Sequence, residues 1–444
     1  MGGCGRPPPR GVPAQLRRPA RRARWHARID HLHAERRLRL PQVRETVGAP
    51  TRRRERPRLT AVSRNASAMF SLHVDTARTW RGGQHQALLT VRGLRRRGER
   101  AALAAQPRGE LFRRAAEGGD LHALAPRGDL DLRAAWRLSR LVRDLAPDVI
   151  HAHDAHAIAM AALARTLAGR RAAPPLIASR RVDFHVRGNA FSRWKYRQVD
   201  RFICASSAIR DMLAADGVPA ARTTVVHEGI DIDRIERAPR LDLHREFDLP
   251  PGCPVAGNVA ALVPHKGQRH LVDAAAQLVR EIPDARVLIV GAGELAGALA
   301  RQIRRLRLEG RVILTGFRSD VPSVLKGLDL FVMSSITEGL GTSVLDAMAA
   351  GLAVVGTRAG GIPESVVEGE TGLLAPPGDA PAMARAMACL LRNTVERRAF
   401  GAAGRRRARA AFSAERMVGE TAAVYAAVAG TGPAANRADP PGTP

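Results

Sequence analysis

From residue 69 to about residue 428, short strand-like runs alternate with amphipathic stretches. The runs have the length and residue types of buried strands. They lie at residues 70–74, 101–105, 148–153, 177–181 and 201–205, and again at 254–262, 286–290, 312–318 and 328–333. The stretch after residue 267 carries its apolar side chains on one helical stripe. This alternation predicts an α/β protein, built on parallel sheets that helices cover on both faces.

The most informative stretch follows the run at residues 328–333. Glu338 begins a loop with glycines at 339 and 341, which allow close approach of the backbone to a ligand. We predict that Thr342 caps a helix over residues 343–350, whose free N–H groups and positive dipole end suit an anion. Asp346 lies on the same helix face as Thr342, and Glu338 stands at a strand end, where open α/β sheets bind ligands. Phosphate fits the amides and acidic side chains suit sugar hydroxyls, so the stretch predicts a sugar-nucleotide site. The alternative is that both acids only cap or solvate the start of a helix.

Residues 338–346 resemble the Glu-x7-Glu motif of the retaining GT-B glycosyltransferases of family 4, and the resemblance extends over most of residues 69–428. It is most specific around this motif, where the matched segments are residues 347–349, 354–355, 360–364 and 370–374. The resemblance implies two Rossmann-like, doubly wound domains that face each other across a cleft. We place an acceptor-side domain at 69–235, a nucleotide-sugar-binding domain at 250–410, and a helix at 412–428 that returns to the first domain.

The resemblance also implies roles for individual residues. Glu338 would contact hydroxyls of the donor sugar, and Asp346 would hold the ribose, although it is one methylene shorter than the glutamate of the family. Lys266 would bind the diphosphate. The family's arginine five positions earlier is replaced by Ala261, which removes one cation from the leaving group. Backbone groups of the loop and helix start complete the donor site, and they belong to Gly339, Leu340, Gly341, Thr342 and Ser343.

On the first domain, the resemblance assigns Gly82 and Gly83 to a turn that approaches donor and acceptor, and His153 to the reaction centre. A simple tight turn and a hydrogen-bonded strand-end histidine are the alternatives. His151 and His153 at i and i+2 of a strand could imitate a metal pair, but no third ligand of suitable spacing is evident. An Asp-x-Asp pair at 129–131 precedes a helix and is more simply a cap. We therefore predict no catalytic metal and no cofactor.

The net charge of +29 brings nucleic acid into consideration. Residues 1–68 hold eighteen arginines against four acidic residues, so this segment supplies much of the excess. It lacks a sustained apolar period and a signal-peptide core, and we interpret it as a disordered extension upstream of a true start at Met69, or else as a basic arm. Residues 430–444 also have the composition of a disordered tail. Aromatic residues make up only 4% of the chain and no binding motif for nucleic acid is present, so nucleic acid is not an expected partner.

The remaining composition limits the location of the protein. No apolar run approaches the roughly 18 residues of a membrane span, and four scattered cysteines indicate reduced thiols. We expect a cytoplasmic protein, with peripheral contact of its arginine-rich first domain to the anionic inner face of the cell membrane. Arg180 and Arg181, at a strand end, are compatible with an anionic acceptor or with simple solvation.

Taken with the resemblance, these features predict a metal-independent, retaining glycosyltransferase. It would move a sugar from a nucleoside diphosphate sugar to a hydroxyl of a glycan or glycolipid, such as lipopolysaccharide core or another cell-envelope glycan. Three other readings remain: a sugar-nucleotide epimerase of the same architecture, a nucleic-acid-binding protein, and a non-catalytic sugar-nucleotide-binding relative. The last is favoured by the departures at Ala261 and Asp346.

Overall fold

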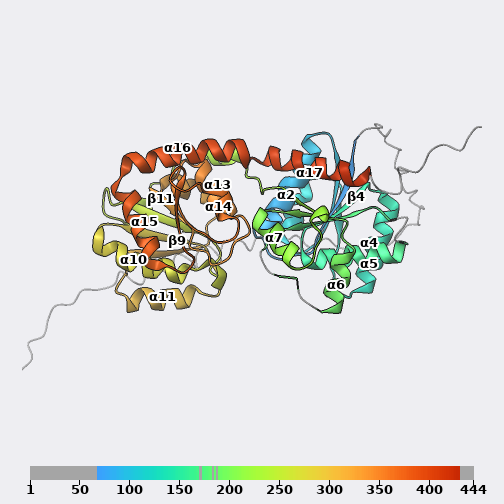
Figure 1. The fold of residues 1–444 in the computed structure, drawn as a ribbon, viewed down its shortest axis with the longest axis horizontal. Coiled ribbons are helices and arrows are strands. Elements are labelled where there is room, and N and C mark those ends of the chain that lie inside the picture. Colours follow the sequence, from blue (N-terminus) through green and yellow to red (C-terminus); the bar gives the residue numbers. More distant parts are fainter. Residues whose placement is uncertain (1–67, 170–172, 183–184, 187–188, 431–444) are drawn as a thin grey trace, which may run out of the picture. The chain divides into compact units, whose positions relative to one another are not determined.

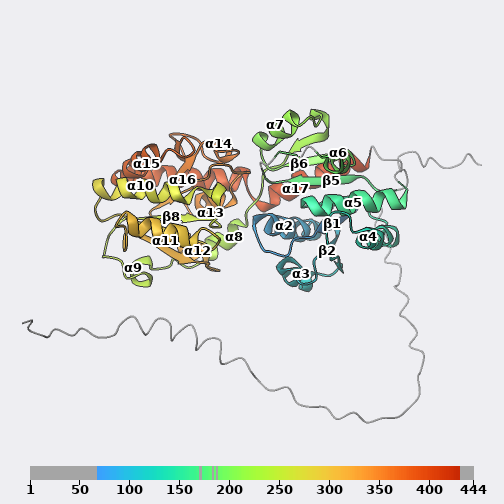
Figure 2. The same ribbon diagram turned by 90° about the horizontal axis from the view of Figure 1, so that it is seen from below.

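The structure is a computed structural model that describes residues 68–169, 173–182, 185–186 and 189–430. The predicted extension and tail therefore lie outside the described residues, except for their innermost positions. Two parallel sheets form the framework, with helices on both faces of each (Figures 1 and 2). The α/β class with doubly wound sheets is confirmed.

The first sheet has seven parallel strands in the order β3-β2-β1-β4-β5-β6-β7. Its strands are β1 (Phe70–Asp75), β2 (Arg100–Ala105), β3 (Leu121–Ala123), β4 (Val149–Ala152), β5 (Leu176–Arg180), β6 (Arg201–Cys204) and β7 (Thr223–Val225). The helices that connect or cover them are α2 (Gly82–Arg96), α3 (Glu110–Ala115), α4 (Leu132–Leu145), α5 (Ala155–Ala168), α6 (Ala190–Arg197) and α7 (Ser207–Ala215). The five central strands are buried along almost their whole length, as expected for a parallel sheet covered on both faces, whereas the edge strands β3 and β7 are partly exposed.

The second sheet has six parallel strands in the order β10-β9-β8-β11-β12-β13. Its strands are β8 (Val255–Val259), β9 (Arg286–Val290), β10 (Val312–Gly316), β11 (Leu330–Val332), β12 (Val354–Thr357) and β13 (Gly372–Ala375). Its helices are α8 (Ile232–Arg237), α9 (Leu243–Glu246), α10 (Gln268–Glu281), α11 (Ala296–Arg305), α12 (Val321–Gly327), α13 (Thr342–Ala349), α14 (Ile362–Ser365), α15 (Ala380–Arg392) and α16 (Thr394–Ala411).

Helix α17 (Ala414–Ala429) ends the described chain and packs against α2 of the first sheet (Figure 1). Ser413 caps it by accepting a hydrogen bond from the backbone N–H of Arg416. The two helices approach closely because Gly93 has no side chain; a Cβ there would lie 2.4 Å from a methyl group of Val418. Tyr425 is fully buried in this contact.

Most predicted elements match the observed ones, but the start of α13 differs. Thr342 is its first helical residue and not its cap, and the helix ends at Ala349. The cap position is taken by Gly341, whose φ of 87° is the left-handed conformation that glycine adopts without penalty. The cap therefore offers no side-chain acceptor, and the first N–H groups of the helix are not covered by one.

Candidate functional site

The strand order of each sheet reverses direction at one point, and ligands of open α/β sheets bind beside that point at the carboxyl ends of the strands. In the first sheet the reversal falls between β1 and β4, which end near Asp75 and His153. In the second it falls between β8 and β11, which are followed by the loops that carry Lys266 and Glu338. The residues predicted to react therefore lie at both switch points.

Lys266 and Glu338 form an ion pair, with Nζ 2.5 Å from Oε2. Their side chains are 19% and 11% exposed, so the pair is largely withdrawn from water. The hydroxyl of Ser335 donates a second hydrogen bond to the same carboxylate oxygen at 2.9 Å. The loop that presents Lys266 is fixed by Gly267, which has a φ of 64° and leaves no room for a Cβ beside the carbonyl oxygen of Ser334. Two oppositely charged groups are thus held rigidly at the switch point of the second sheet, where the sequence predicts the donor sugar and its diphosphate to bind.

The loop at residues 338–341 is packed against backbone on both sides. A Cβ on Gly339 would lie 2.1 Å from the carbonyl oxygen of Arg181, and one on Gly360 would lie 1.7 Å from that of Glu338. The N–H of Gly361 donates to the carbonyl oxygens of both Glu338 and Gly339. Because only glycine allows these approaches, the main chain that carries Glu338 has little freedom to shift.

The start of α13 supplies N–H groups to this loop region. Among the described residues, the amides of Thr342 and Ser343 have no hydrogen-bond acceptor. Both residues are partly exposed, and a helix start with free N–H groups attracts an anion. A Cβ on Gly82 would lie 3.6 Å from the hydroxyl of Thr342, so these two predicted residues are neighbours. A Cβ on Gly83 would have no neighbour within 4 Å.

Asp346 lies one turn into α13 and is partly exposed. Although part of the residue is exposed, desolvation of its carboxyl group raises its pKa from 3.8 to about 7; Arg234 on α8 acts in the opposite direction, and the nearby Asp231 adds to the rise. Leu340, in contrast, is buried in the core of the second sheet, so only its backbone can serve a ligand. The role of Asp346 at the ribose stays a prediction.

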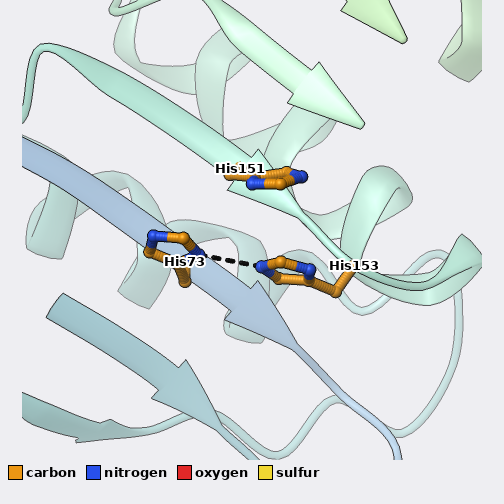
Figure 3. A group of neighbouring side chains, drawn as sticks. All are labelled: His73, His151 and His153. Atoms are coloured by element: carbon orange, nitrogen blue, oxygen red, sulfur yellow. Dashed lines mark hydrogen bonds between the residues drawn. The ribbon is translucent and has the colours of Figure 1, made fainter. Parts of the chain in front are cut away.

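His153 lies in a cluster of three buried histidines at the end of the first sheet (Figure 3). His73 Nδ1 lies 2.8 Å from His153 Nε2, and the rings of His151 and His153 are 4.1 Å apart between centroids. The sequence revealed no third histidine for a metal set, but the pairing of β1 with β4 places His73 opposite His151. The three histidines come together because β1 and β4 are paired in the sheet, although His73 is far from the other two in the sequence.

Hydrogen bonds fix the protonation of this cluster. An arginine side chain can only donate, so His153 Nδ1, 3.2 Å from Arg181 Nη1, must accept. His153 Nε2–H then donates to His73 Nδ1, and His73 Nε2–H faces the hydroxyl of Ser71 at 3.0 Å. Burial lowers the pKa of His73 to about 3 and that of His153 well below its usual value, so both rings are neutral.

His151 completes the cluster. Its Nδ1 lies 2.5 Å from the hydroxyl of Tyr425 on α17, and its Nε2 lies 2.8 Å from the hydroxyl of Ser179. Every ring nitrogen of the three histidines therefore has a protein partner, and the cation of Arg181 stands beside them. A divalent metal would have to break these bonds and would be repelled by the guanidinium group. The chemistry of the cluster fits a hydrogen-bonded support better than a metal centre.

Arg181 joins the two parts of the site. Its Nε lies 3.4 Å from Glu228 Oε1, and its carbonyl oxygen packs on Gly339. Burial raises the pKa of Glu228 from 4.5 to about 7, against the attraction of Arg181 and with a contribution from Glu338. In the sequence Arg181 stands out only as half of an arginine pair at a strand end, and Glu228 carries no signal of its own. The signal that could have singled them out is burial, which requires tertiary structure.

Two parallel, doubly wound sheets, each with polar site residues at its switch point, define the GT-B class of glycosyltransferase folds. The chain belongs to the glycosyltransferases of this class: residues 240–407 match the family of glycosyl transferases group 1, and residues 80–234 match glycosyltransferase family 4. The resemblance predicted from the motif around Glu338 is confirmed.

Solved structures support the fold. Anabaena HepE in complex with UDP superposes with a TM-score of 0.70 at 23% identity, over 81% of this chain and 100% of that chain. A glycosyltransferase from Rickettsia africae gives a TM-score of 0.70 at 18% identity, over 82% of this chain and 99% of that chain. At such identities the likeness concerns the fold alone.

Among curated relatives, 2-deoxystreptamine glucosyltransferase of Streptomyces kanamyceticus is 34% identical over 202 residues. That match covers 44% of this chain and 52% of the relative, about half its length. Putative glycosyltransferase EpsD of Bacillus subtilis is 29% identical over 66% of this chain and 79% of its own.

Proposed function

We propose that the protein is a retaining glycosyltransferase that needs no metal and moves a sugar from a nucleoside diphosphate sugar to an acceptor hydroxyl. The observation that carries the proposal is the largely buried ion pair of Lys266 and Glu338, next to a helix start where the amides of Thr342 and Ser343 have no acceptor among the described residues. Lys266 and the two backbone N–H groups would bind the diphosphate, and the carboxylate of Glu338 would bind the sugar hydroxyls. All of these groups belong to loops that are packed rigidly against one another. HepE was solved with UDP and with UDP-glucose, which supports a nucleotide-sugar donor of this kind.

In the proposed reaction, the bond between the anomeric carbon and the diphosphate oxygen breaks while a bond to the acceptor oxygen forms on the same face of the sugar. The proton of the acceptor hydroxyl passes to the departing diphosphate. Lys266 and the α13 amides stabilise the charge that develops on the leaving group, a role that a metal ion fills in other enzymes. His153 stays the predicted neighbour of the reacting sugar; a sugar hydroxyl reaches its ring nitrogens only by replacing Arg181 or His73.

The missing family arginine is the principal difficulty for catalysis, because Ala261 is exposed and carries no charge. Arg181 is the described cation that we expect to compensate, because its backbone carbonyl packs on the loop that carries Glu338. In addition, the positive charges of Arg181 and Lys266 both attract the carboxylate of Glu228. We assign it the second positive charge of the site. A non-catalytic sugar-nucleotide-binding relative is the alternative that Ala261 favours.

For the acceptor we propose a glycan or glycolipid of the cell envelope, with lipopolysaccharide among the candidates. The supporting relative is a putative colanic acid biosynthesis glycosyltransferase, WcaL of Salmonella typhimurium, which is 31% identical over 44% of this chain. Among the described residues no helix is both long and apolar enough to cross a bilayer. We propose a cytoplasmic enzyme that meets its acceptor by peripheral contact with the membrane.

The test is a panel of UDP-, GDP- and ADP-linked sugars, with release of free nucleoside diphosphate as the signal. One donor should be hydrolysed slowly, the reaction should survive EDTA, and Glu338→Gln and Lys266→Met should each slow it by about 10²–10³-fold. Binding of a donor without turnover would favour the non-catalytic relative. Failure to bind any donor would overturn the proposal.

A further inference from the structure

A cluster of large apolar side chains lies exposed at the start of α4. Leu130, Leu132 and Trp136 are 66%, 61% and 51% exposed. They account for three of the seven large hydrophobic side chains that are exposed among the described residues. Single exposed leucines are common, but a local cluster of this kind indicates an interaction surface.

Arginines surround this cluster. A groove of about 370 Å³ beside it is lined by Arg127, Arg133 and Arg137 together with the end of β3. Arg140 lies over the ring of Trp136, 5.1 Å from its centroid. Within the described part of the chain, the guanidinium groups of Arg133 and Arg137 make no ion pair. Their charges are thus available to an outside partner.

Two acidic residues belong to the same segment, and one of them, Asp131, lines the groove with the three arginines and attracts Arg127. One carboxylate leaves the groove with a net positive charge. The Asp131 carboxylate accepts hydrogen bonds from the backbone N–H groups of Arg127 and Ala134, both at 3.0 Å, and so caps α4. Asp129 pairs with Lys195 on α6 at 3.0 Å and with His156 on α5. These bonds hold the loop in place on the body of the sheet.

The same bonds place the surface near the candidate site. α4 packs along α5 (Figure 2), and both helices begin at the edge of the sheet where the parallel strands end. His156, which Asp129 contacts, lies in the first turn of α5, three residues after His153 at the end of β4. A partner bound at the start of α4 would therefore lie at the edge where the acceptor is expected.

We infer that Leu130, Leu132 and Trp136, with the groove formed by Arg127, Arg133 and Arg137, are a docking surface for an anionic phospholipid membrane. The arginines face lipid phosphates, and the apolar side chains enter the interface, where tryptophan is favoured. Phosphate groups match the unpaired guanidinium groups, and acyl chains match the exposed leucines. Neither a soluble anion nor a flat polar partner would account for both halves of the surface. The inference deepens the proposed function, because it explains how the enzyme would reach a membrane-bound acceptor.

The experiment uses the full-length protein and vesicles of phosphatidylglycerol in phosphatidylcholine, without donor or acceptor. Arg133→Gln combined with Arg137→Gln should weaken co-sedimentation about thirtyfold, at roughly fivefold for each arginine near the surface. The matched control combines Arg385→Gln with Arg398→Gln, which removes two exposed arginines from α15 and α16. This control should bind as the wild type does.

A local signal separates this surface from the basic segment at residues 1–68, which is also expected to attract anionic vesicles. The fluorescence of Trp136 is the difference between the emission of the wild type and that of Trp136→Phe. Vesicles that contain brominated lipids should quench this difference. Absence of that quenching would overturn the inference, as would equal loss of binding in both double variants. So would equal binding to pure phosphatidylcholine, or an RNA that competes for the same arginines more strongly than the vesicles.

Donor hydrolysis in the absence of vesicles keeps the two proposals separate. Both double variants should hydrolyse the donor at the wild-type rate, since neither pair lies among the donor-site residues. Normal vesicle binding without donor hydrolysis would reject the proposed reaction alone. Normal hydrolysis without vesicle binding would reject the docking surface alone.

Discussion

Replacing Gly339 by alanine tests whether the packing of the Glu338 loop matters for the reaction. The new Cβ would lie 2.1 Å from the carbonyl oxygen of Arg181, whereas ordinary contact begins near 3.4 Å. The loop and the strand end would have to separate by about 1.3 Å. A misplacement of about 1 Å in a catalytic group costs on the order of a hundredfold in rate, or about 2.7 kcal/mol of barrier.

The same change should also lower the stability of the protein. Gly339 does not have a positive φ, so alanine fits its backbone conformation. The added methyl group would nevertheless overlap the carbonyl oxygen of Arg181, and overpacking of this kind lowers the free energy of unfolding by about 1–3 kcal/mol. We therefore expect turnover to fall about a hundredfold, with a lower urea denaturation midpoint and a protein that is still folded in the absence of urea.

The assay is the initial rate of transfer or of donor hydrolysis, measured over a range of donor concentrations. Gly419→Ala is the matched control, because its Cβ would meet nothing closer than a guanidinium nitrogen of Arg97 at 3.7 Å. If Gly339→Ala retains turnover within threefold of the wild type, the contact between the loop and Arg181 has no part in catalysis. An equal loss in Gly419→Ala would show that the effect is not specific to the loop.

Further predictions concern charges and hydrogen bonds. Lys266→Met and Glu338→Gln should each lower turnover by about 10²–10³-fold, and the double variant by little more, because the two act as a unit; additive losses would contradict this. If Asp346 binds ribose as a carboxylate, its pKa of about 7 predicts that donor affinity, measured by calorimetry, rises with pH through 7. Asp346→Asn should flatten that profile. Since folding raises the pKa of Asp346, the stability that its protonated form contributes is complete below about pH 4 and is lost as the pH rises through 7. Thermal melts should therefore show a fall in the melting temperature over this pH range that is smaller in Asp346→Asn than in the wild type. Tyr425→Phe should lower the free energy of unfolding by about 1–3 kcal/mol, because His151 Nδ1 loses its partner; a denaturation curve unchanged from the wild type would refute this.

Much of the local structure could be predicted because it depends on neighbours in the chain. The apolar runs became the buried strands of two parallel sheets, since a strand covered on both faces requires apolar residues throughout. Asp131 and Ser413 cap helices as short-range rules predict. The start of α13 was misplaced by one residue, because Gly341 adopts a left-handed conformation that makes a side-chain cap unnecessary.

By itself the sequence determined the α/β class, the strand positions and, through the motif around Glu338, the family. Only the tertiary structure decided which distant residues share the site. The pairing of β1 with β4 puts His73 beside His153, and the approach of Gly339 to Arg181 links loops that lie far apart in the chain. Burial, not residue type, makes Arg181, Glu228 and Asp346 distinctive, because desolvation shifts their pKa values. Desolvation depends on every atom packed around a group, and no local pattern of residues records it.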